Sequence, residues 1–198
     1  MASLVQGCGA GSGSGTVTSN PAGITCGADC SEPYPFNTSV VLTAAAATGS
    51  TFTGWSGGGC SGTGTCMVTI SAAINVTATF TLQTFTLTVN KAGTGAGSVD
   101  SAPTGITCGA DCSEVVGYGT MMTLTATPTT GSSFTGWSGG GCSGTGSCVV
   151  SVTAATTVTA TFDLISYTLT AAKTGTGAGT VTSTPAGISC GADCSEPY

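Results

Sequence analysis

The stretch Phe52-Thr-Gly-Trp-Ser-Gly-Gly-Gly-Cys-Ser-Gly-Thr-Gly64 decides the fold, because the same thirteen residues return unchanged from Phe134 to Gly146. The two copies are 82 residues apart, and Cys26, Cys108 and Cys190 follow one another at the same spacing. No insertion interrupts this period. Self-similarity at a fixed period is typical of tandem arrays of small structural units. The sequence therefore predicts a repeat protein.

The period divides the 198-residue chain into two near-complete repeats and a partial one. We place repeat 1 at residues 11–82, repeat 2 at residues 83–164 and a truncated repeat 3 at residues 165–198, with residues 1–10 as a leader or an incomplete first strand. The joints between repeats are short and contain neither Gly nor Pro, unlike flexible linkers. They predict fixed packing between neighbouring repeats, and hence a stiff rod.

Within a repeat, apolar and polar residues alternate over short runs such as Thr84–Asn90 and Thr120–Thr127. This period of two indicates strands with one buried face, about six of them in each repeat. We expect the glycine-rich segment Gly93–Gly97 to join two strands of a hairpin. The predicted fold is all-β, built of small antiparallel meander or sandwich-like repeats stapled by disulfides. The expected core aromatic residues are Phe52, Trp55, Phe80, Phe134, Trp137 and Phe162.

The 11 cysteines indicate an oxidising, extracellular location. Each full repeat carries Cys-x3-Cys and Cys-x5-Cys, and four cysteines allow three pairings or a four-thiolate zinc site. We favour local disulfides, because glycine-rich loops can bend tightly and the Cys-x2-Cys spacing of zinc knuckles is missing. Cys8 is left over as a free or intermolecular thiol. The predicted disulfide cysteines are Cys26, Cys30, Cys60, Cys66, Cys108, Cys112, Cys142, Cys148, Cys190 and Cys194.

Charge and composition exclude several classes of function. Lys and Arg together number 2 against 8 Asp and Glu, the net charge is −6, and there is no His. Nucleic-acid binding needs a basic patch that neutralises phosphates, so we expect no nucleic-acid partner. A catalytic triad that uses His cannot be built, so we expect neither an enzyme nor a bound cofactor. No apolar run is long enough to cross a bilayer, which predicts no membrane insertion.

Three further patterns allow more than one interpretation. Asp29 and Glu32, which recur in the later repeats, could support acid–base chemistry or bind Ca²⁺, but a solvated acidic turn is favoured. Gly93–Gly97 resembles a phosphate loop, although a strand follows it where such a loop needs a helix. Threonines spaced two apart, as in Thr123–Thr127, would form rows on one sheet face. Such a face could bind ice, glycan or another sheet, but ordinary solvent-facing strand threonine is favoured.

The repeats resemble the divergent InlB B-repeat family of bacterial surface proteins. The most specific shared motif is Phe-x-Gly-Trp-Ser-Gly, found at residues 52–57 and 134–139. The likeness runs through Phe85–Cys112 and Leu124–Cys148, whereas Ser3–Cys8 departs from the pattern. It implies a small all-β repeat used as a spacer or adhesive module, with no catalytic residues to transfer.

These observations predict a secreted structural protein of the bacterial surface, either a rigid stalk or the subunit of a filament. The expected partner is a second copy that associates head to tail. One alternative is an adhesin that binds surface glycans or ice through its threonine faces or acidic loops. Another is a non-catalytic accessory segment of a larger secreted enzyme.

Overall fold

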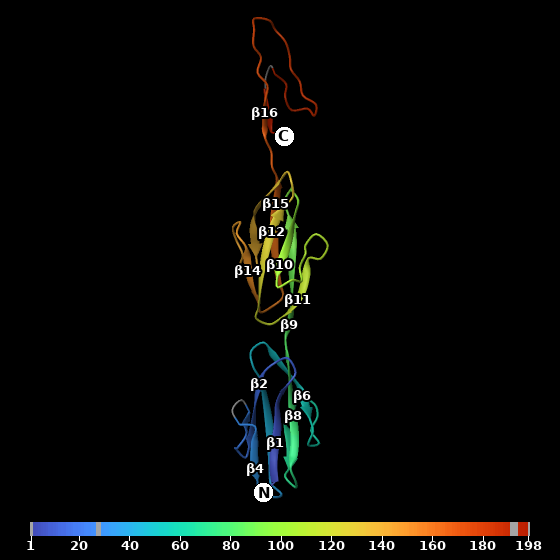
Figure 1. Ribbon diagram of the computed structural model, residues 1–198, viewed down its shortest axis with the longest axis vertical. Coiled ribbons are helices and arrows are strands. Elements are labelled where there is room, and N and C mark those ends of the chain that lie inside the picture. The colour runs from blue at the N-terminus through green and yellow to red at the C-terminus, as the bar shows by residue number, and fades with distance from the viewer. Residues whose placement is uncertain (1, 27–28, 191–193, 198) are drawn as a thin grey trace.

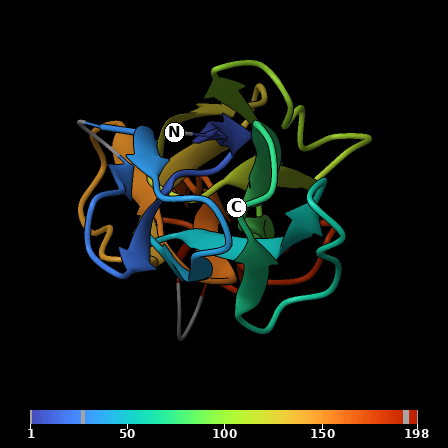
Figure 2. The same ribbon diagram turned by 90° about the horizontal axis from the view of Figure 1, so that it is seen from below.

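The computed structural model describes residues 2–26, 29–190 and 194–197, and it describes residues 2–10 and 196–197 by their backbone only. The described residues form strands and turns and no helix, which confirms the predicted all-β fold. Two strand-rich units lie end to end along the long axis, and a more open third unit follows at the C-terminal end (Figure 1). Viewed along that axis, the units overlap in projection (Figure 2).

The first unit, here called the first sandwich, consists of two sheets. One sheet has the strand order β4-β1-β8-β6 and the other the order β3-β2-β5-β7. Its strands are β1 (Ala2–Ala10), β2 (Gly15–Asn20), β3 (Thr25–Cys26), β4 (Ser31–Tyr34), β5 (Ser39–Ala46), β6 (Ser50–Ser56), β7 (Cys66–Thr69) and β8 (Ile74–Leu82).

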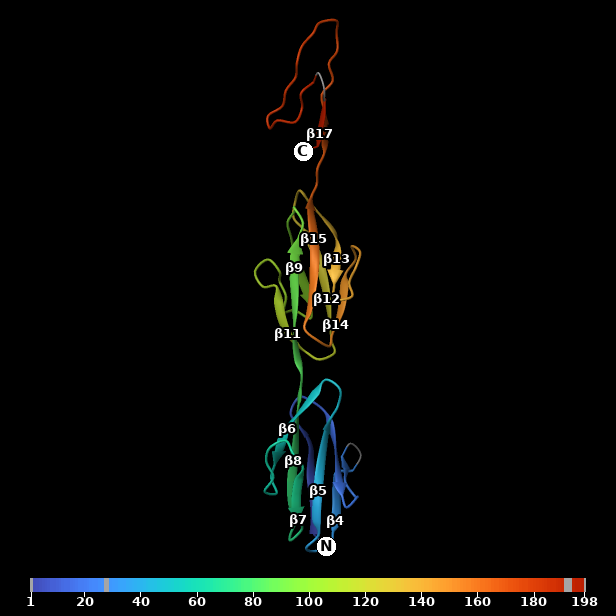
Figure 3. The same cartoon turned by 180° about the vertical axis from the view of Figure 1, so that it is seen from behind.

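The second sandwich repeats this arrangement, with sheet orders β11-β9-β15-β13 and β10-β12-β14. Its strands are β9 (Thr84–Ala92), β10 (Gly97–Ala102), β11 (Ser113–Gly117), β12 (Thr120–Pro128), β13 (Ser132–Gly139), β14 (Cys148–Val152) and β15 (Thr156–Leu164). Figure 3 shows both sandwiches from behind, with β9 beside β15 in the second. The third unit contributes only β16 (Thr168–Thr170) and β17 (Ser195–Pro197), which pair antiparallel.

One pair of strands in each sandwich runs parallel, a feature the sequence pattern did not indicate. β1 pairs with β8, and β9 pairs with β15, at the centre of the first sheet. The other ladders are antiparallel. The chain therefore enters and leaves each sandwich along neighbouring strands that point the same way.

The hairpin predicted across Gly93–Gly97 is wrong. β9 and β10 lie in opposite sheets, so this segment crosses from one sheet to the other. The loop is fixed at the end of β15, where Gly95 N–H donates to the Phe162 carbonyl at 2.8 Å. Alternation of apolar and polar residues shows which face of a strand is buried. It does not show whether the next strand pairs with it in the same sheet or faces it across the core, because the pattern is the same in both cases.

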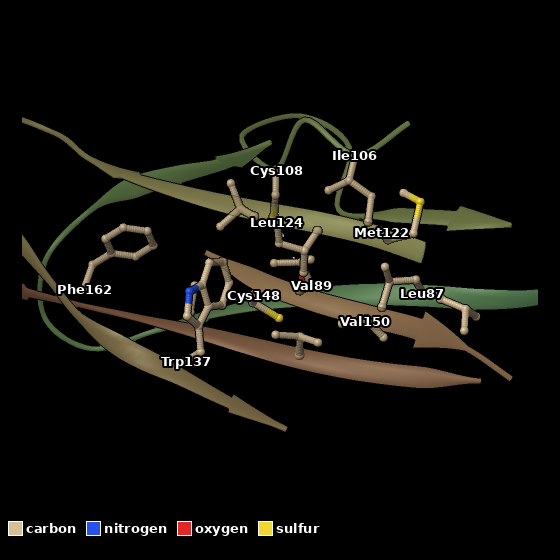
Figure 4. Close-up of a cluster of buried hydrophobic side chains, with 14 residues drawn as sticks. Leu87, Val89, Ile106, Cys108, Met122, Leu124, Trp137, Cys148, Val150 and Phe162 are labelled. Atoms are coloured by element: carbon tan, nitrogen blue, oxygen red, sulfur yellow. Dashed lines mark hydrogen bonds between the residues drawn. The ribbon is translucent and has the colours of Figure 1, made fainter. Parts of the chain in front are cut away.

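The core of each sandwich lies between its two sheets. In the second sandwich, Trp137, Leu124 and Val150 enter it from three different strands (Figure 4). Phe162 is fully buried there, and its ring centroid lies 5.4 Å from that of Phe134. Phe134 itself is half-buried and packs against the cluster. The first sandwich repeats this core with Trp55, Phe80 and Phe52 in the same roles.

Candidate functional site: the joint between sandwiches

The two sandwiches are connected through a single residue between strands. β8 ends at Leu82 and β9 begins at Thr84, so Gln83 alone forms the covalent link. Gln83 N–H donates to the Gly49 carbonyl at 2.8 Å, and Tyr118 N–H donates to the Gln83 carbonyl at 2.8 Å. Both backbone groups of the link are therefore bonded, one to each sandwich. A link held in this way has little freedom to swing.

Side chains close the joint around this link. The Tyr118 ring lies directly on Gly49, where an added Cβ would overlap its atoms. Gly49 also has a φ of +74°, a region that favours glycine. Leu82 packs under Gly117, and the Tyr118 ring lies 6.4 Å from that of Phe85. This packing is what the short joints between repeats predict, but sequence reasoning did not identify Tyr118 or Gly49.

The same positions are open at the outer ends of the two sandwiches. Phe36 is the counterpart of Tyr118, one period earlier, and is 75% exposed. Gly131 is the counterpart of Gly49, and no atom would lie within 4 Å of a Cβ added to it. Leu164, the counterpart of Leu82, is 62% exposed.

Cystine loops close the sides of the sandwiches. Cys60 is bonded to Cys66 and Cys142 to Cys148, with Cα atoms 5.5 Å apart in each pair. The shorter loops bond Cys108 to Cys112 and, in the third unit, Cys190 to Cys194. Cys26 and Cys30 are also disulfide-bonded. The side chain of Cys8 lies outside the described residues.

Each long cystine loop is also bonded to the core. Trp55 Nε1–H donates to the Gly64 carbonyl, and Trp137 Nε1–H to the Gly146 carbonyl, each at 2.6 Å. The indole ring thus packs in the core while its polar edge satisfies a carbonyl of the loop. The phenylalanine three residues earlier meets it edge-on, with centroids 5.0 Å apart for Phe134 and Trp137. The repeated thirteen-residue motif thus packs the core and binds the long cystine loop to it.

The acidic residues of the short cystine loops form turns. Asp29 accepts from the Ser31 N–H at 3.1 Å, and Asp111 from the Ser113 N–H at 3.2 Å. Glu114 lies over Gly105, as Glu32 lies over Gly23. In the described parts of the chain no three His, Cys, Asp or Glu side chains gather as a metal site would require. Asp193 and the side chain of Glu196 fall outside the described residues.

The threonine rows predicted from the sequence occur on the strands of the sandwiches. The threonines of β8 and β15 point away from the core, since Thr77 and Thr159 alternate with fully buried Ala78 and Ala160. Within the residues that the structure describes, no helix is long and apolar enough to cross a membrane.

Comparison with known protein families identifies the family of the repeats. A family model described as "Divergent InlB B-repeat domain" matches residues 10–84 and again residues 85–166. These two matches meet between Thr84 and Phe85, at the start of β9 and one residue after the link Gln83. No curated protein sequence matches the chain.

Two solved structures show a distant likeness. The major pilin protein T-13 of Streptococcus pyogenes has a TM-score of 0.43 and 10% sequence identity, covering 83% of this chain and 98% of the pilin chain. The shaft pilin spaA of Lactobacillus rhamnosus GG, as a D295N mutant, has a TM-score of 0.27 and 9% identity, covering 81% of this chain and 98% of that one. Neither TM-score reaches 0.5.

Proposed function

Because the chain belongs to the divergent InlB B-repeat domain family, we propose that it is a structural extracellular protein of the bacterial surface, a rigid rod that serves as a stalk or as a filament subunit. The joint carries this proposal. Its link, Gln83, is hydrogen-bonded to both sandwiches, and the Tyr118 ring lies on Gly49, whose carbonyl accepts one of these bonds. Each added sandwich then lengthens the molecule in a fixed direction.

Composition supports an extracellular and non-enzymatic role. Disulfides persist in oxidising compartments, and each sandwich carries two short cystine loops. The carboxylates of these loops cap turns or cover glycines, so they already have structural roles. The chain has no His to act as a general base near neutral pH. We therefore assign it neither an active site nor a cofactor.

Stiffness at the joint is the property to test. Gly49→Ala places a methyl group where the Tyr118 ring lies, whereas Gly131→Ala adds the same methyl group in open space. Both glycines have a positive φ, +74° and +81°, so the backbone cost of about 1 kcal/mol is matched between the variants. We expect Gly49→Ala to broaden the distribution of angles between sandwiches, and Gly131→Ala to leave it unchanged.

Small-angle X-ray scattering and electron microscopy of the non-reduced chain measure this distribution. A wild-type molecule that already bends freely at Gln83 would contradict the proposal. Long filaments with a regular axial repeat would identify a filament subunit. Short separate rods at all concentrations would identify a stalk.

A further inference from the structure

One edge of the second sandwich is open to a further strand. β11 comes first in the order β11-β9-β15-β13, so it pairs with β9 on one side only. Figure 3 shows it on the outer side of β9. Val115, at the middle of β11, is 59% exposed. A strand edge of this kind presents backbone donors and acceptors to any strand that fits it.

The hydrogen bonds of β11 show which of its backbone groups are directed outwards. Val89 N–H donates to the Cys112 carbonyl at 2.8 Å, and Tyr118 N–H donates to the Gln83 carbonyl at 2.8 Å. Bonded residues alternate along an antiparallel strand, so the even-numbered residues of this ladder point their backbone groups at β9. The residues whose backbone groups point away from β9 are Ser113, Val115 and Gly117.

Two of the six outward groups already have partners within the chain. Ser113 N–H donates to the Asp111 carboxylate at 3.2 Å. The Gly117 carbonyl accepts from the Thr120 hydroxyl at 2.7 Å. Within the described part of the chain, four outward groups of β11 are therefore left without a strand partner. They are the N–H and the carbonyl of Val115, the carbonyl of Ser113 and the N–H of Gly117.

These four groups fit a second copy of the same edge. When two copies of β11 run antiparallel with Val115 opposite Val115, each Val115 N–H meets the Val115 carbonyl of the other copy. Each Gly117 N–H then meets the Ser113 carbonyl of the other copy. The groups left over in this register are the Ser113 N–H and the Gly117 carbonyl, which are the two that the chain already satisfies. The edge is thus complementary to itself about a two-fold axis.

The first sandwich closes the same edge with proline. One period earlier, Pro33 stands in place of Val115 and Pro35 in place of Gly117, so neither residue that would supply an outward donor has an N–H. Proline on an edge strand is a common protection against pairing with another chain. β4 nevertheless pairs with β1 across Pro33, so proline at this place is compatible with the strand. The open edge distinguishes the second sandwich from the first.

The side chains along β11 are compatible with this pairing. The exposed Val115 side chains of the two copies would cover one another, which removes apolar surface from water. In the same register Glu114 lies opposite Val116 of the second copy, and Asp111 lies opposite Gly119. Neither acid of the edge therefore faces an acid of the other copy.

We propose that β11 is a binding edge for a second copy of this chain, at which the four-stranded sheets of two second sandwiches join into one continuous sheet. The inference goes beyond the proposed function, because the contact is lateral and needs only the second sandwich. The strands run along the long axis of the molecule (Figure 1), so the two copies lie side by side in opposite directions. Chains that project from two facing surfaces meet in this orientation.

A cross-link at the two-fold axis tests the pairing. Val115→Cys, in a chain that also carries Cys8→Ser, would place two thiols opposite one another, with Cα atoms about 5.5 Å apart, a separation that a disulfide spans. We expect oxidation to give a disulfide-linked dimer. Val149→Cys in the same background is the matched control, because Val149 also lies on an edge strand and is 52% exposed. We expect this control to stay monomeric, and equal dimer yields from the two variants would overturn the proposal.

A proline variant tests the same contact without added cysteine. Val115→Pro introduces the residue that the first sandwich has at this place and removes an N–H that points away from β9. It should therefore fold, which circular dichroism checks. We expect at least about tenfold weaker association by sedimentation, because two hydrogen bonds between copies are lost. Val115→Ile keeps the N–H and the branched apolar side chain and should associate like the wild type. Wild-type chains that stay single at every concentration, or association that survives Val115→Pro, would contradict the proposal.

Energy transfer in the cross-linked Val115→Cys dimer tests the orientation of the two copies. A donor at the N-terminus of one copy and an acceptor at the C-terminus of the other should transfer energy efficiently, whereas labels at both N-termini should not. The opposite pattern would rule out the antiparallel pair. Failure of the pairing would leave the proposed rod intact, because the comparison of Gly49→Ala with Gly131→Ala tests a different contact, at the joint.

Discussion

At the scale of single residues, the tryptophans join two structures that would otherwise be independent. The indole of Trp137 packs in the core, and its N–H holds the carbonyl of Gly146 inside the loop closed by Cys142 and Cys148. A phenylalanine at this position would fill much of the same volume but could not donate that hydrogen bond. The role of Trp137 is thus partly apolar and partly directional.

We expect Trp137→Phe to lower the free energy of unfolding by about 2 kcal/mol, because a hydrogen bond and some buried area are lost together. Chemical denaturation followed by circular dichroism measures the change. Ser138→Ala, at the exposed neighbouring residue, serves as the control and should alter stability by less than about 0.5 kcal/mol. Equal stability of Trp137→Phe and wild type would show that the bond to Gly146 contributes little.

At the scale of elements, the short cystine loop ties β9 to the opposite sheet. Cys108 N–H donates to the Val99 carbonyl, and Val89 N–H donates to the Cys112 carbonyl. The disulfide between Cys108 and Cys112 therefore spans bonds to β10 on one side and β9 on the other. The disulfide therefore helps to hold β10 of one sheet and β9 of the other together at this edge of the sandwich.

Replacing both cysteines, as in Cys108→Ala with Cys112→Ala, should cost about 2 kcal/mol from loop-closure entropy. The loss of buried sulfur at Cys108 adds to this cost. Urea titration monitored by circular dichroism tests the expectation. The same double change at Cys142 and Cys148 provides a comparison with a slightly longer loop. Unaltered urea midpoints in both variants would mean that the strands alone hold these edges.

How much of the architecture could be predicted differs between elements. The period, the alternating strands and the repeat family were all readable, because they depend on local pattern and on self-similarity. The crossing between sheets at Gly93–Gly97 and the parallel pair β9–β15 were not, since alternation carries no information about the partner of a strand. For the joint, the sequence contains one usable signal, an aromatic residue that recurs one period apart as Phe36 and Tyr118.

At the scale of the whole molecule, net charge affects the proposed association of copies. The net charge is −6 at pH 7 and the isoelectric point is about 4.1. Copies therefore repel one another weakly at neutral pH, and this repulsion vanishes as the pH falls towards 4. The chain carries few charges that could steer one copy onto another, so the proposed association would depend on apolar surface and backbone pairing.

We therefore expect association to strengthen between pH 7 and pH 4, with at least about a twofold rise in the mean hydrodynamic radius measured by light scattering. At neutral pH, raising the salt concentration should act in the same direction but more weakly, because salt screens this repulsion. Association that falls as the pH approaches 4.1 would indicate that charged groups hold the copies together.

The parallel pairing of β9 with β15 determines how the second sandwich responds to a pulling force. The chain enters the sandwich at one end on β9 and leaves at the other end on β15, and the two strands are bonded side by side. A pull on the two ends of the chain draws these neighbours past one another, so their cross-strand bonds share the load and must yield together. A hairpin pulled from its open end would instead unzip one bond at a time. The β1–β8 pair gives the first sandwich the same geometry, so in the proposed rod both sandwiches would resist tension applied along the long axis.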